Sequence, residues 1–272
     1  MSKSKKKKKI PWKSVVLITV FLGVSFVLGW FGGSAQAPLL KELPKDDFLL
    51  GLIGIYVFLF LFTFLQTVIH EAGHLFFGLL TGYKYSSFRI GSFIWVKLDG
   101  KLRLKRYSLS GTGGQCLMAP PDMVDGKYPN VLYNFGGCIA NFVFAVVFLA
   151  AFVLMNEPGL LRTFFGMLFA VGIGNVLLNG IPLQVGGISN DGRNALSLGK
   201  DETVMRAFWL QLYVNGLLSE GERMRDLPEG FFFLPEGEGL EDPIVCTVGV
   251  MRYNYYFDVH DSKRRKKPRN IC

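Results

Sequence analysis

The chain has 272 residues, of which 50% are hydrophobic and 19% are charged. This composition excludes a disordered chain, which would be polar and highly charged. The 25 phenylalanines, many of them in long uncharged stretches, argue against an ordinary soluble enzyme and indicate a membrane protein. The net charge of +9 is concentrated at the two ends of the chain, without an aromatic-lined basic groove. It therefore predicts contact with anionic lipid at the basic termini and no binding of nucleic acid.

The first apolar stretch, Val15 to Phe31, follows the lysine-rich segment 1–14. By the positive-inside rule this order predicts a basic cytoplasmic N-terminus and a transmembrane helix over residues 15–33. A cleaved signal peptide is the alternative, because Ala35-Gln36-Ala37 resembles a cleavage site. The length of the apolar run and the interfacial Trp30 favour a retained anchor.

Further apolar stretches cover residues 48–80, 131–155 and 160–181, each long enough, or nearly so, to cross a bilayer. If the chain alternates in direction, the loop 84–130 and the region 196–272 are both cytoplasmic, and both are rich in Lys and Arg as the positive-inside rule requires. The sequence thus predicts a multi-pass protein of the cell membrane with both termini in the cytoplasm. A bacterial plasma membrane is the default, and residence in a eukaryotic organelle stays open.

Two smaller elements are expected in the cytoplasm. Residues 93–98 and 101–105 flank Asp99-Gly100, a favoured type I′ pair, which predicts a β-hairpin. Beyond the last apolar stretch, residues 201–218 and 243–259 are typical of helices. The fold class is therefore an α-helical polytopic membrane protein with a small cytoplasmic β-hairpin and a small α-helical C-terminal module.

Two of the three histidines, His70 and His74, lie four residues apart in the second apolar stretch, and Glu71 lies between them. On a helix this spacing turns both imidazoles to one side, where they can bind one Zn²⁺, and it places the carboxylate to act on water. A salt-bridged helix face, a satisfied polar core and a proton relay are the ordinary alternatives. Ionisable groups at membrane depth are expensive, however, so the pattern favours a metal site.

A catalytic zinc needs a third protein ligand. His260 lies in the C-terminal region between Asp258 and Asp261 and is expected to be a solvated surface residue. Asp191 follows the last apolar stretch, where a chain broken at Pro182 could return to the metal. A turn-forming Asn-Asp-Gly after a helix is, taken alone, the better explanation of Asp191.

Three motifs, in this order, resemble those of the site-2 protease family of intramembrane zinc metalloproteases. They are His70-Glu71-Ala72-Gly73-His74, then Gly137-Cys138-Ile139-Ala140-Asn141, then Asn179-Gly180-Ile181-Pro182 followed by Asp191-Gly192. The resemblance covers about residues 48–195, which it implies form a three-helix metalloprotease core. The chain looks like a compact member, without the PDZ or CBS domains of some relatives.

The resemblance implies that His70, His74 and Asp191 bind Zn²⁺ and that Glu71 is the general base. The distance in sequence from Pro182 to Asp191 is longer here than is usual in the family, and a bulged loop would be needed to deliver the carboxylate.

The resemblance also implies that Asn141 binds substrate or stabilises the oxyanion, with helix packing beside Gly136-Gly137 as the alternative. Asn179 is expected to support the site by hydrogen bonding.

The implied activity is hydrolysis of peptide bonds in or near the transmembrane segments of membrane-bound proteins or peptides, for regulated intramembrane proteolysis or for clearance of signal-peptide remnants. The hairpin resembles the family's membrane-associated sheet, which can pair with an extended substrate. One alternative is a catalytically silent membrane scaffold that binds a partner helix, with or without a structural metal. The other is a transporter with a histidine relay, which the lack of an inverted repeat disfavours.

Overall fold

A computed structural model describes residues 48–98, 100–108, 113–157, 159–185, 188–233 and 242–266. The expected N-terminal basic segment 1–14 and transmembrane helix 15–33 lie outside these residues, as does the end of the basic tail.

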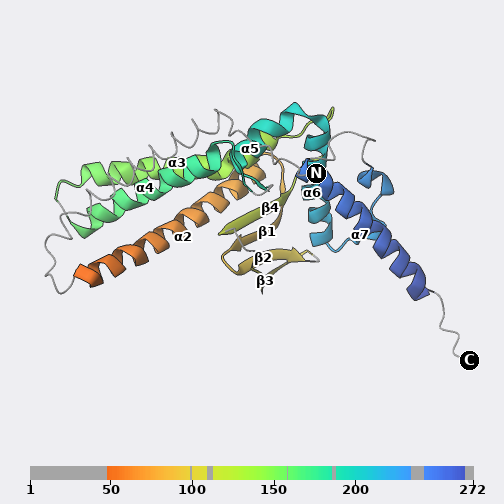
Figure 1. Ribbon diagram of the computed structural model, residues 1–272, viewed down its shortest axis with the longest axis horizontal. Helices are drawn as coiled ribbons and strands as arrows, with labels where there is room; N and C mark the ends of the chain where they lie inside the picture. Colours follow the sequence, from red (N-terminus) through yellow and green to blue (C-terminus); the bar gives the residue numbers. More distant parts are fainter. Residues whose placement is uncertain are drawn as a thin grey trace, which may run out of the picture. The chain divides into compact units, whose positions relative to one another are not determined.

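The described part of the chain is mainly helical. Its long helices are α2 (Phe48–Leu80), α3 (Asn130–Leu154), α4 (Leu160–Gly180), α6 (Glu202–Ser219) and α7 (Pro243–Lys266), with the short α5 (Asp191–Ser197). The strands are β1 (Lys84–Ile90), β2 (Phe93–Leu98), β3 (Lys101–Arg106), β4 (Gly114–Ala119), β5 (Gln184–Val185) and β6 (Ile188–Ser189). Three 3-10 turns are η2 (Leu198–Lys200), η3 (Met224–Asp226) and η4 (Glu229–Phe232). The helices and strands are labelled in Figure 1 where there is room.

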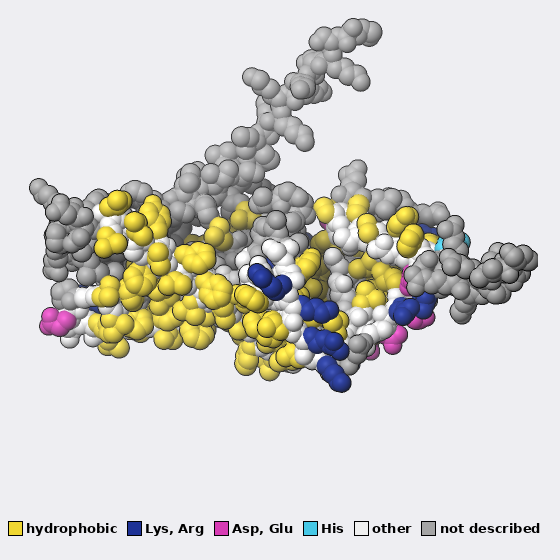
Figure 2. All heavy atoms as spheres, turned by 90° about the horizontal axis from the view of Figure 1, so that it is seen from below, with side chains coloured by type: hydrophobic (Ala, Val, Ile, Leu, Met, Phe, Trp, Pro, Cys, Tyr) yellow, Lys and Arg dark blue, Asp and Glu magenta, His cyan; other side chains and the backbone are white. Residues whose placement is uncertain are grey.

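Helices α2, α3 and α4 are long and apolar enough to cross a membrane. Their apolar spans contain 32, 25 and 21 residues, and at 1.5 Å per residue even the shortest reaches about the 30 Å of a bilayer core. Large hydrophobic side chains are exposed along all three, including Phe60, Val147 and Leu161. Figure 2 shows many hydrophobic side chains exposed on the visible face. Exposed apolar side chains along such helices suit lipid rather than water.

The chain divides into two compact units. Among the described residues, the first contains 48–63 and 143–177, and the second contains 64–142 and 178–266. The core of the first unit is aromatic: the rings of Phe58 and Phe164 lie 4.4 Å apart, next to the buried Phe62. The residues of the candidate site all belong to the second unit.

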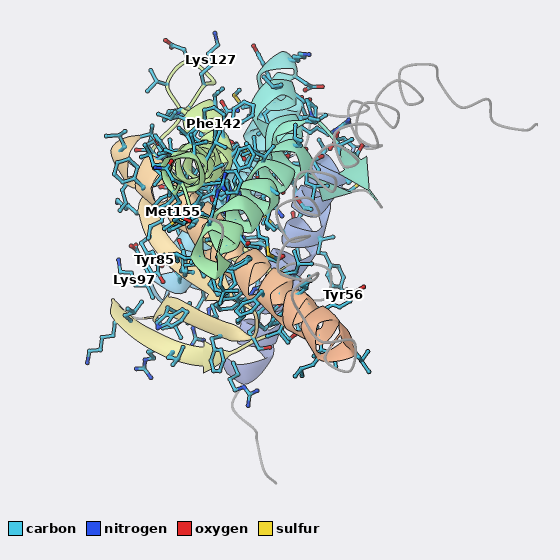
Figure 3. The ribbon with its side chains drawn as sticks, turned by 90° about the vertical axis from the view of Figure 1, so that its left-hand side faces the viewer. Tyr56, Tyr85, Lys97, Lys127, Phe142 and Met155 are labelled. Atoms are coloured by element: carbon cyan, nitrogen blue, oxygen red, sulfur yellow. The ribbon has the colours of Figure 1, made fainter. Side chains whose placement is uncertain are left out.

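The second unit contains a four-stranded antiparallel sheet in the order β3-β2-β1-β4. The predicted hairpin is present as β2 and β3, and Gly100 at its turn has a φ of +75°, the left-handed conformation that such a turn requires. The sheet is larger than expected, because β1 and β4 extend it on the side of the helices. Figure 3 labels Tyr85 of β1 and Lys97 of β2, and the Tyr85 hydroxyl donates to the Trp95 carbonyl oxygen at 2.6 Å.

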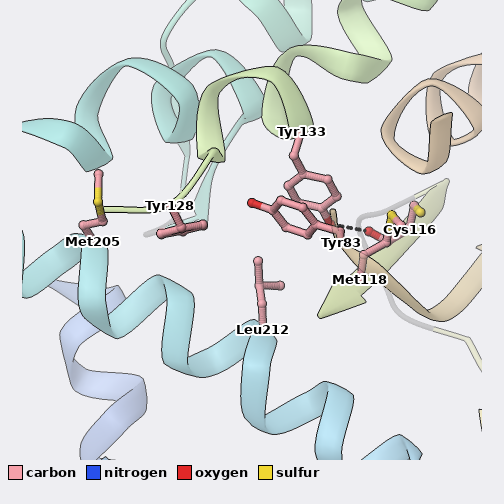
Figure 4. Close-up of a cluster of buried hydrophobic side chains, with 7 residues drawn as sticks. All are labelled: Tyr83, Cys116, Met118, Tyr128, Tyr133, Met205 and Leu212. Atoms are coloured by element: carbon pink, nitrogen blue, oxygen red, sulfur yellow. Dashed lines mark hydrogen bonds between the residues drawn. The ribbon is translucent and has the colours of Figure 1, made fainter. Parts of the chain in front are cut away.

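A buried cluster joins the sheet to the helices around it (Figure 4). Tyr133 of α3 stacks on Tyr83 with ring centroids 4.4 Å apart, and its hydroxyl donates to the Cys116 carbonyl oxygen at 2.8 Å. Met205 and Leu212 of α6 complete the cluster. The first predicted C-terminal helix is therefore α6, which packs against the sheet, and the second is α7, which packs against α6.

Helices α2 and α3 approach closely where glycines face each other. A Cβ on Gly73 would lie 2.3 Å from the Gly136 carbonyl oxygen, and one on Gly136 would lie 2.7 Å from the Gly73 carbonyl oxygen. Neither position can accept a side chain unless the backbones separate. In a lipid environment such small-residue contacts are the usual basis of helix association, because they let backbones pack directly.

We expect Gly73→Ala to lower the free energy of unfolding by about 1–3 kcal/mol through overpacking, and to weaken metal binding by the adjacent histidines. The measurement is thermal unfolding in detergent, together with Zn²⁺ affinity. Gly54→Ala is the matched control, because it lies on the same helix and its Cβ would meet no atom within 4 Å. Equal stabilities of the two variants would contradict the close approach.

Candidate metal centre

Three ligand-type side chains converge in the second unit. His70 and His74 project from one side of α2, and Asp191 is the first residue of α5. Among the described residues these three form one group whose ligand atoms all lie within 4.8 Å of one another. Both histidines are buried, whereas the Asp191 side chain keeps 23% of its exposure.

The Nδ1 atom of each imidazole makes a hydrogen bond on the side away from the other ligands. Nδ1 of His70 lies 2.8 Å from Oδ1 of Asn141, and Nδ1 of His74 lies 2.8 Å from the Tyr133 carbonyl oxygen. Both partners accept, so each Nδ1 carries the proton and donates it. In the neutral imidazoles Nε2 is then a bare lone pair, which is the form in which histidine binds a metal.

The distances fit a small cation. Nε2 of His70 lies 3.1 Å from Nε2 of His74 and 2.9 Å from Oδ2 of Asp191. Nε2 of His74 lies 3.4 Å from the same Asp191 oxygen. Tetrahedral zinc with bonds of about 2.0–2.1 Å holds its ligand atoms about 3.3 Å apart. Three electron-rich atoms at such distances repel one another unless a metal or protons lie between them, so the donor set suits Zn²⁺.

The long connection from α4 to Asp191 is compact. Strands β5 and β6 pair in an antiparallel ribbon that folds the extra residues back on themselves, and the Asn190 N–H donates to the Leu183 carbonyl oxygen at 3.0 Å. This ribbon is how the longer gap between Pro182 and Asp191 is accommodated. The described residues of this connection therefore have regular strand pairing.

Asn190 joins the two ends of this connection. Its Nδ2 donates to the carbonyl oxygens of Leu178 at 2.7 Å and Ile181 at 2.6 Å. Its Oδ1 accepts from the backbone N–H of Leu183 at 3.0 Å and of Arg193 at 3.1 Å, which makes it the N-cap of α5. In the sequence this residue stands out only as part of a turn-forming Asn-Asp-Gly. Its residue type could have indicated this role, because Asn is favoured at the N-cap just before a helix.

The glycine of the Asp-Gly pair, Gly192, lies against the end of α4. A Cβ there would lie 2.0 Å from the Gly180 carbonyl oxygen at the end of α4, so only glycine lets α5 begin against that helix. Asn179 lies at the same end of α4, and its carbonyl oxygen would be 3.1 Å from the same Cβ. The supporting role expected for the Asn179 side chain stays a prediction.

Burial by itself would raise the pKa of Asp191, but when no metal is bound and the imidazoles are protonated, the hydrogen bonds and charges of His70 and His74 outweigh it and hold the pKa well below its usual range. The carboxylate is therefore ionised at neutral pH and available as a ligand.

Glu71 is buried against β4. A Cβ on Gly114 would lie 2.7 Å from both Cγ and Oε1 of Glu71, so the absence of a side chain at Gly114 makes room for the carboxylate. Burial and the Glu71 charge raise the pKa of the neighbouring Cys116 thiol, which stays protonated.

The Gly-x-x-x-Asn element contacts His70 at both of its ends. A Cβ on Gly137 would lie 2.5 Å from Cε1 of His70, and Asn141 hydrogen-bonds the same ring. His260, the third histidine, is exposed on α7, as expected of a surface residue. Gln66, which the sequence analysis did not single out, is buried beside Asn141; its signal was its position one helical turn before His70.

We expect Asn190→Ala to release Asp191 and lower the affinity for Zn²⁺ by about tenfold, as loss of a supporting partner of a ligand does. Loss of the N-cap should also cost about 0.5–2 kcal/mol of stability. Zn²⁺ competition against a chromophoric chelator measures the first effect. The control is Asn194→Ala on the same short helix, and an unchanged affinity of the Asn190 variant would show that the connection is positioned by other contacts.

Residues 57–250 match the sequence model of peptidase family M50. No curated protein and no solved structure matches the chain. The matched region covers well over half of the chain and includes the two histidines, Glu71, Asn141 and Asp191. The chain therefore belongs to peptidase family M50, the site-2 protease family.

Proposed function

We propose that the chain is an intramembrane zinc metalloprotease that hydrolyses peptide bonds in or near transmembrane segments of membrane-bound substrates. The observation that carries the proposal is the convergence of Asp191 with His70 and His74 at ligand spacing, with both histidines and Glu71 on the apolar helix α2 of an M50 peptidase. The substrate class is a transmembrane protein or a signal-peptide remnant.

The proposed ligands are His70, His74 and Asp191. Zinc bound there would supply Lewis-acid activation of the scissile carbonyl and of the attacking water. Glu71 would take the proton from that water and pass it to the leaving amine. Its buried position beside β4 favours this role, because it keeps the carboxylate next to the proposed ligands.

Asn141 and Asn179 are proposed to support the site. Asn141 holds His70 by a hydrogen bond in the ground state, which favours a positioning role over direct binding of substrate.

Strand β3 is the edge that we propose for substrate pairing. It is the outer strand of the sheet and all of its residues are exposed. The other edge strand, β4, already accepts a side-chain hydrogen bond at Cys116. Pairing with β3 would hold a substrate segment extended and so expose amides that a helix conceals.

The proposed topology has both termini in the cytoplasm. The basic segments at the two ends suit the anionic lipid of a cytoplasmic leaflet. With α2, α3 and α4, a retained first apolar segment would make four spans of a cell membrane.

Glu71→Gln should abolish cleavage while Zn²⁺ stays bound, because the amide cannot accept the proton and the three ligands are unchanged. New peptide termini are compared in membranes that contain the wild-type chain or the variant. Termini that depend on Glu71 and map to transmembrane segments would establish the activity and name the substrates. Zinc in both proteins with identical termini would instead favour a membrane scaffold that keeps its metal.

Leu104→Pro tests the pairing edge. The Tyr107 N–H donates to the Ser92 carbonyl oxygen, so along β3 the N–H groups of Leu102 and Leu104 alternate away from β2. Proline at 104 removes an outward donor without breaking the hairpin ladder. We expect cleavage of a substrate identified by its Glu71-dependent termini to slow about tenfold. The variant loses one hydrogen bond to the substrate, of about 1 kcal/mol, and the extended geometry of the strand at this position.

Leu104→Ala is the matched control for the loss of the side chain, and Zn²⁺ content verifies that the site is intact. Unchanged cleavage by the proline variant would contradict pairing along this part of β3.

A further inference from the structure

Gln66 lies one turn before His70 on α2 and is fully buried, at 0% exposure. It contacts Asn141 of α3, which is equally buried. The Asn141 Nδ2 donates to Oε1 of Gln66 at 2.6 Å and to the Gln66 carbonyl oxygen at 3.0 Å. On its other side, Oδ1 of Asn141 accepts from Nδ1 of His70 at 2.8 Å. The three side chains thus form a chain of hydrogen bonds that ends at a candidate metal ligand.

The direction of this chain follows from the chemistry of its atoms. A backbone carbonyl oxygen only accepts, so the end of the Asn141 amide that faces Gln66 must be its NH₂. Both hydrogens of that NH₂ are used, one on each Gln66 oxygen. The opposite end of the amide is therefore an oxygen, and His70 can meet it only with a protonated Nδ1. Nε2 of neutral His70 is then left without a proton, facing His74 and Asp191.

The two histidines differ in what supports them. His74 donates to the Tyr133 carbonyl oxygen, a group that has no donor end. His70 donates to a side-chain amide, whose oxygen and NH₂ ends are nearly the same size. If the amide of Asn141 turned over, it would present a donor to His70 and favour the tautomer with Nδ1 bare and Nε2 protonated. That tautomer cannot bind a metal through Nε2, so only His70 needs its partner to be oriented.

We propose that Gln66 is a positioning residue of the metal centre, which orients the Asn141 amide and through it keeps the Nε2 lone pair of His70 directed at the metal. The inference rests on the zinc site proposed above and assigns to it a residue outside the three family motifs. Of the two Gln66 oxygens, the side-chain one makes the shorter contact. The backbone oxygen also accepts the hydrogen bond of its own helix, so the side chain is the stronger of the two acceptors.

The test compares Gln66→Met with the wild type in full-length protein in detergent. Methionine keeps the length and volume of the side chain but removes the oxygen, so the Asn141 amide loses its shorter bond. We expect the affinity for Zn²⁺, measured by competition with a chromophoric chelator, to fall about tenfold, the lower end of the range for supporting partners of ligands. Thr63→Val is the matched control: one turn earlier on the same helix, it removes an exposed hydroxyl that donates to the Leu59 carbonyl oxygen, and should leave the affinity unchanged.

A double-mutant cycle separates positioning from general damage. Asn141→Leu removes the amide through which Gln66 is proposed to act, so adding Gln66→Met to it should weaken Zn²⁺ binding no further. At saturating Co²⁺ the Gln66→Met variant should show the visible absorption spectrum of the wild type, because the same three ligands bind. A misfolded protein would lose that spectrum.

The outcomes divide cleanly. If wild-type protein binds no stoichiometric zinc, the proposed function fails and this inference fails with it. If the wild type binds zinc and Gln66→Met binds it equally well, only the positioning role is overturned. Additive losses in the Gln66 and Asn141 variants would also overturn it, because Gln66 would then act on the metal by another route.

Discussion

The arrangement of this site depends on one electrostatic constraint: three electron-rich atoms, two imidazole nitrogens and a carboxylate oxygen, must be held together inside an apolar helical framework. They lie 2.9–3.4 Å apart and repel one another in the absence of a cation. Hydrogen bonds from the surrounding structure hold each ligand in place against that repulsion. Asn141 and the Tyr133 carbonyl oxygen hold the imidazoles, and the N-cap Asn190 holds the start of the helix that carries Asp191.

Glycine provides the space in which these groups meet. Gly73 and Gly136 let α2 and α3 touch backbone to backbone, Gly137 accepts the ring of His70, and Gly192 lets α5 begin against the end of α4. Lipid offers no hydrophobic force to press helices together, so close van der Waals contact between small residues has to do so. The same residues that assemble the helices therefore also determine how near the ligands come. A substitution that separates the helices at this site should therefore also change the distances between the metal ligands.

Two buried amides within the apolar spans, Gln66 and Asn141, join His70 in a network of hydrogen bonds. Gln66 and Asn141 are fully buried, yet the amide of Asn141 uses both hydrogens and its oxygen. In a low-dielectric interior an unmade hydrogen bond is costly, so such a network also specifies one orientation of each amide. This specificity is what a metal ligand with two tautomers needs. The same hydrogen bonds thus pair the buried amides and orient the metal ligand.

Features that depend on local spacing could be predicted from the sequence alone: three apolar helices close to their observed ends, the hairpin at Asp99-Gly100, and two histidines on one side of a helix. These follow from composition and from the helical repeat, which act over a few residues. Tertiary structure decided the rest. Asp191 lies 117 residues beyond His74, and the β5–β6 ribbon and Asn190 help to return it to the histidines. Gln66 appeared as one more polar residue in an apolar stretch until α3 brought Asn141 against it. Local periodicity carries no information about such long-range partners, because they are set by how separate helices pack.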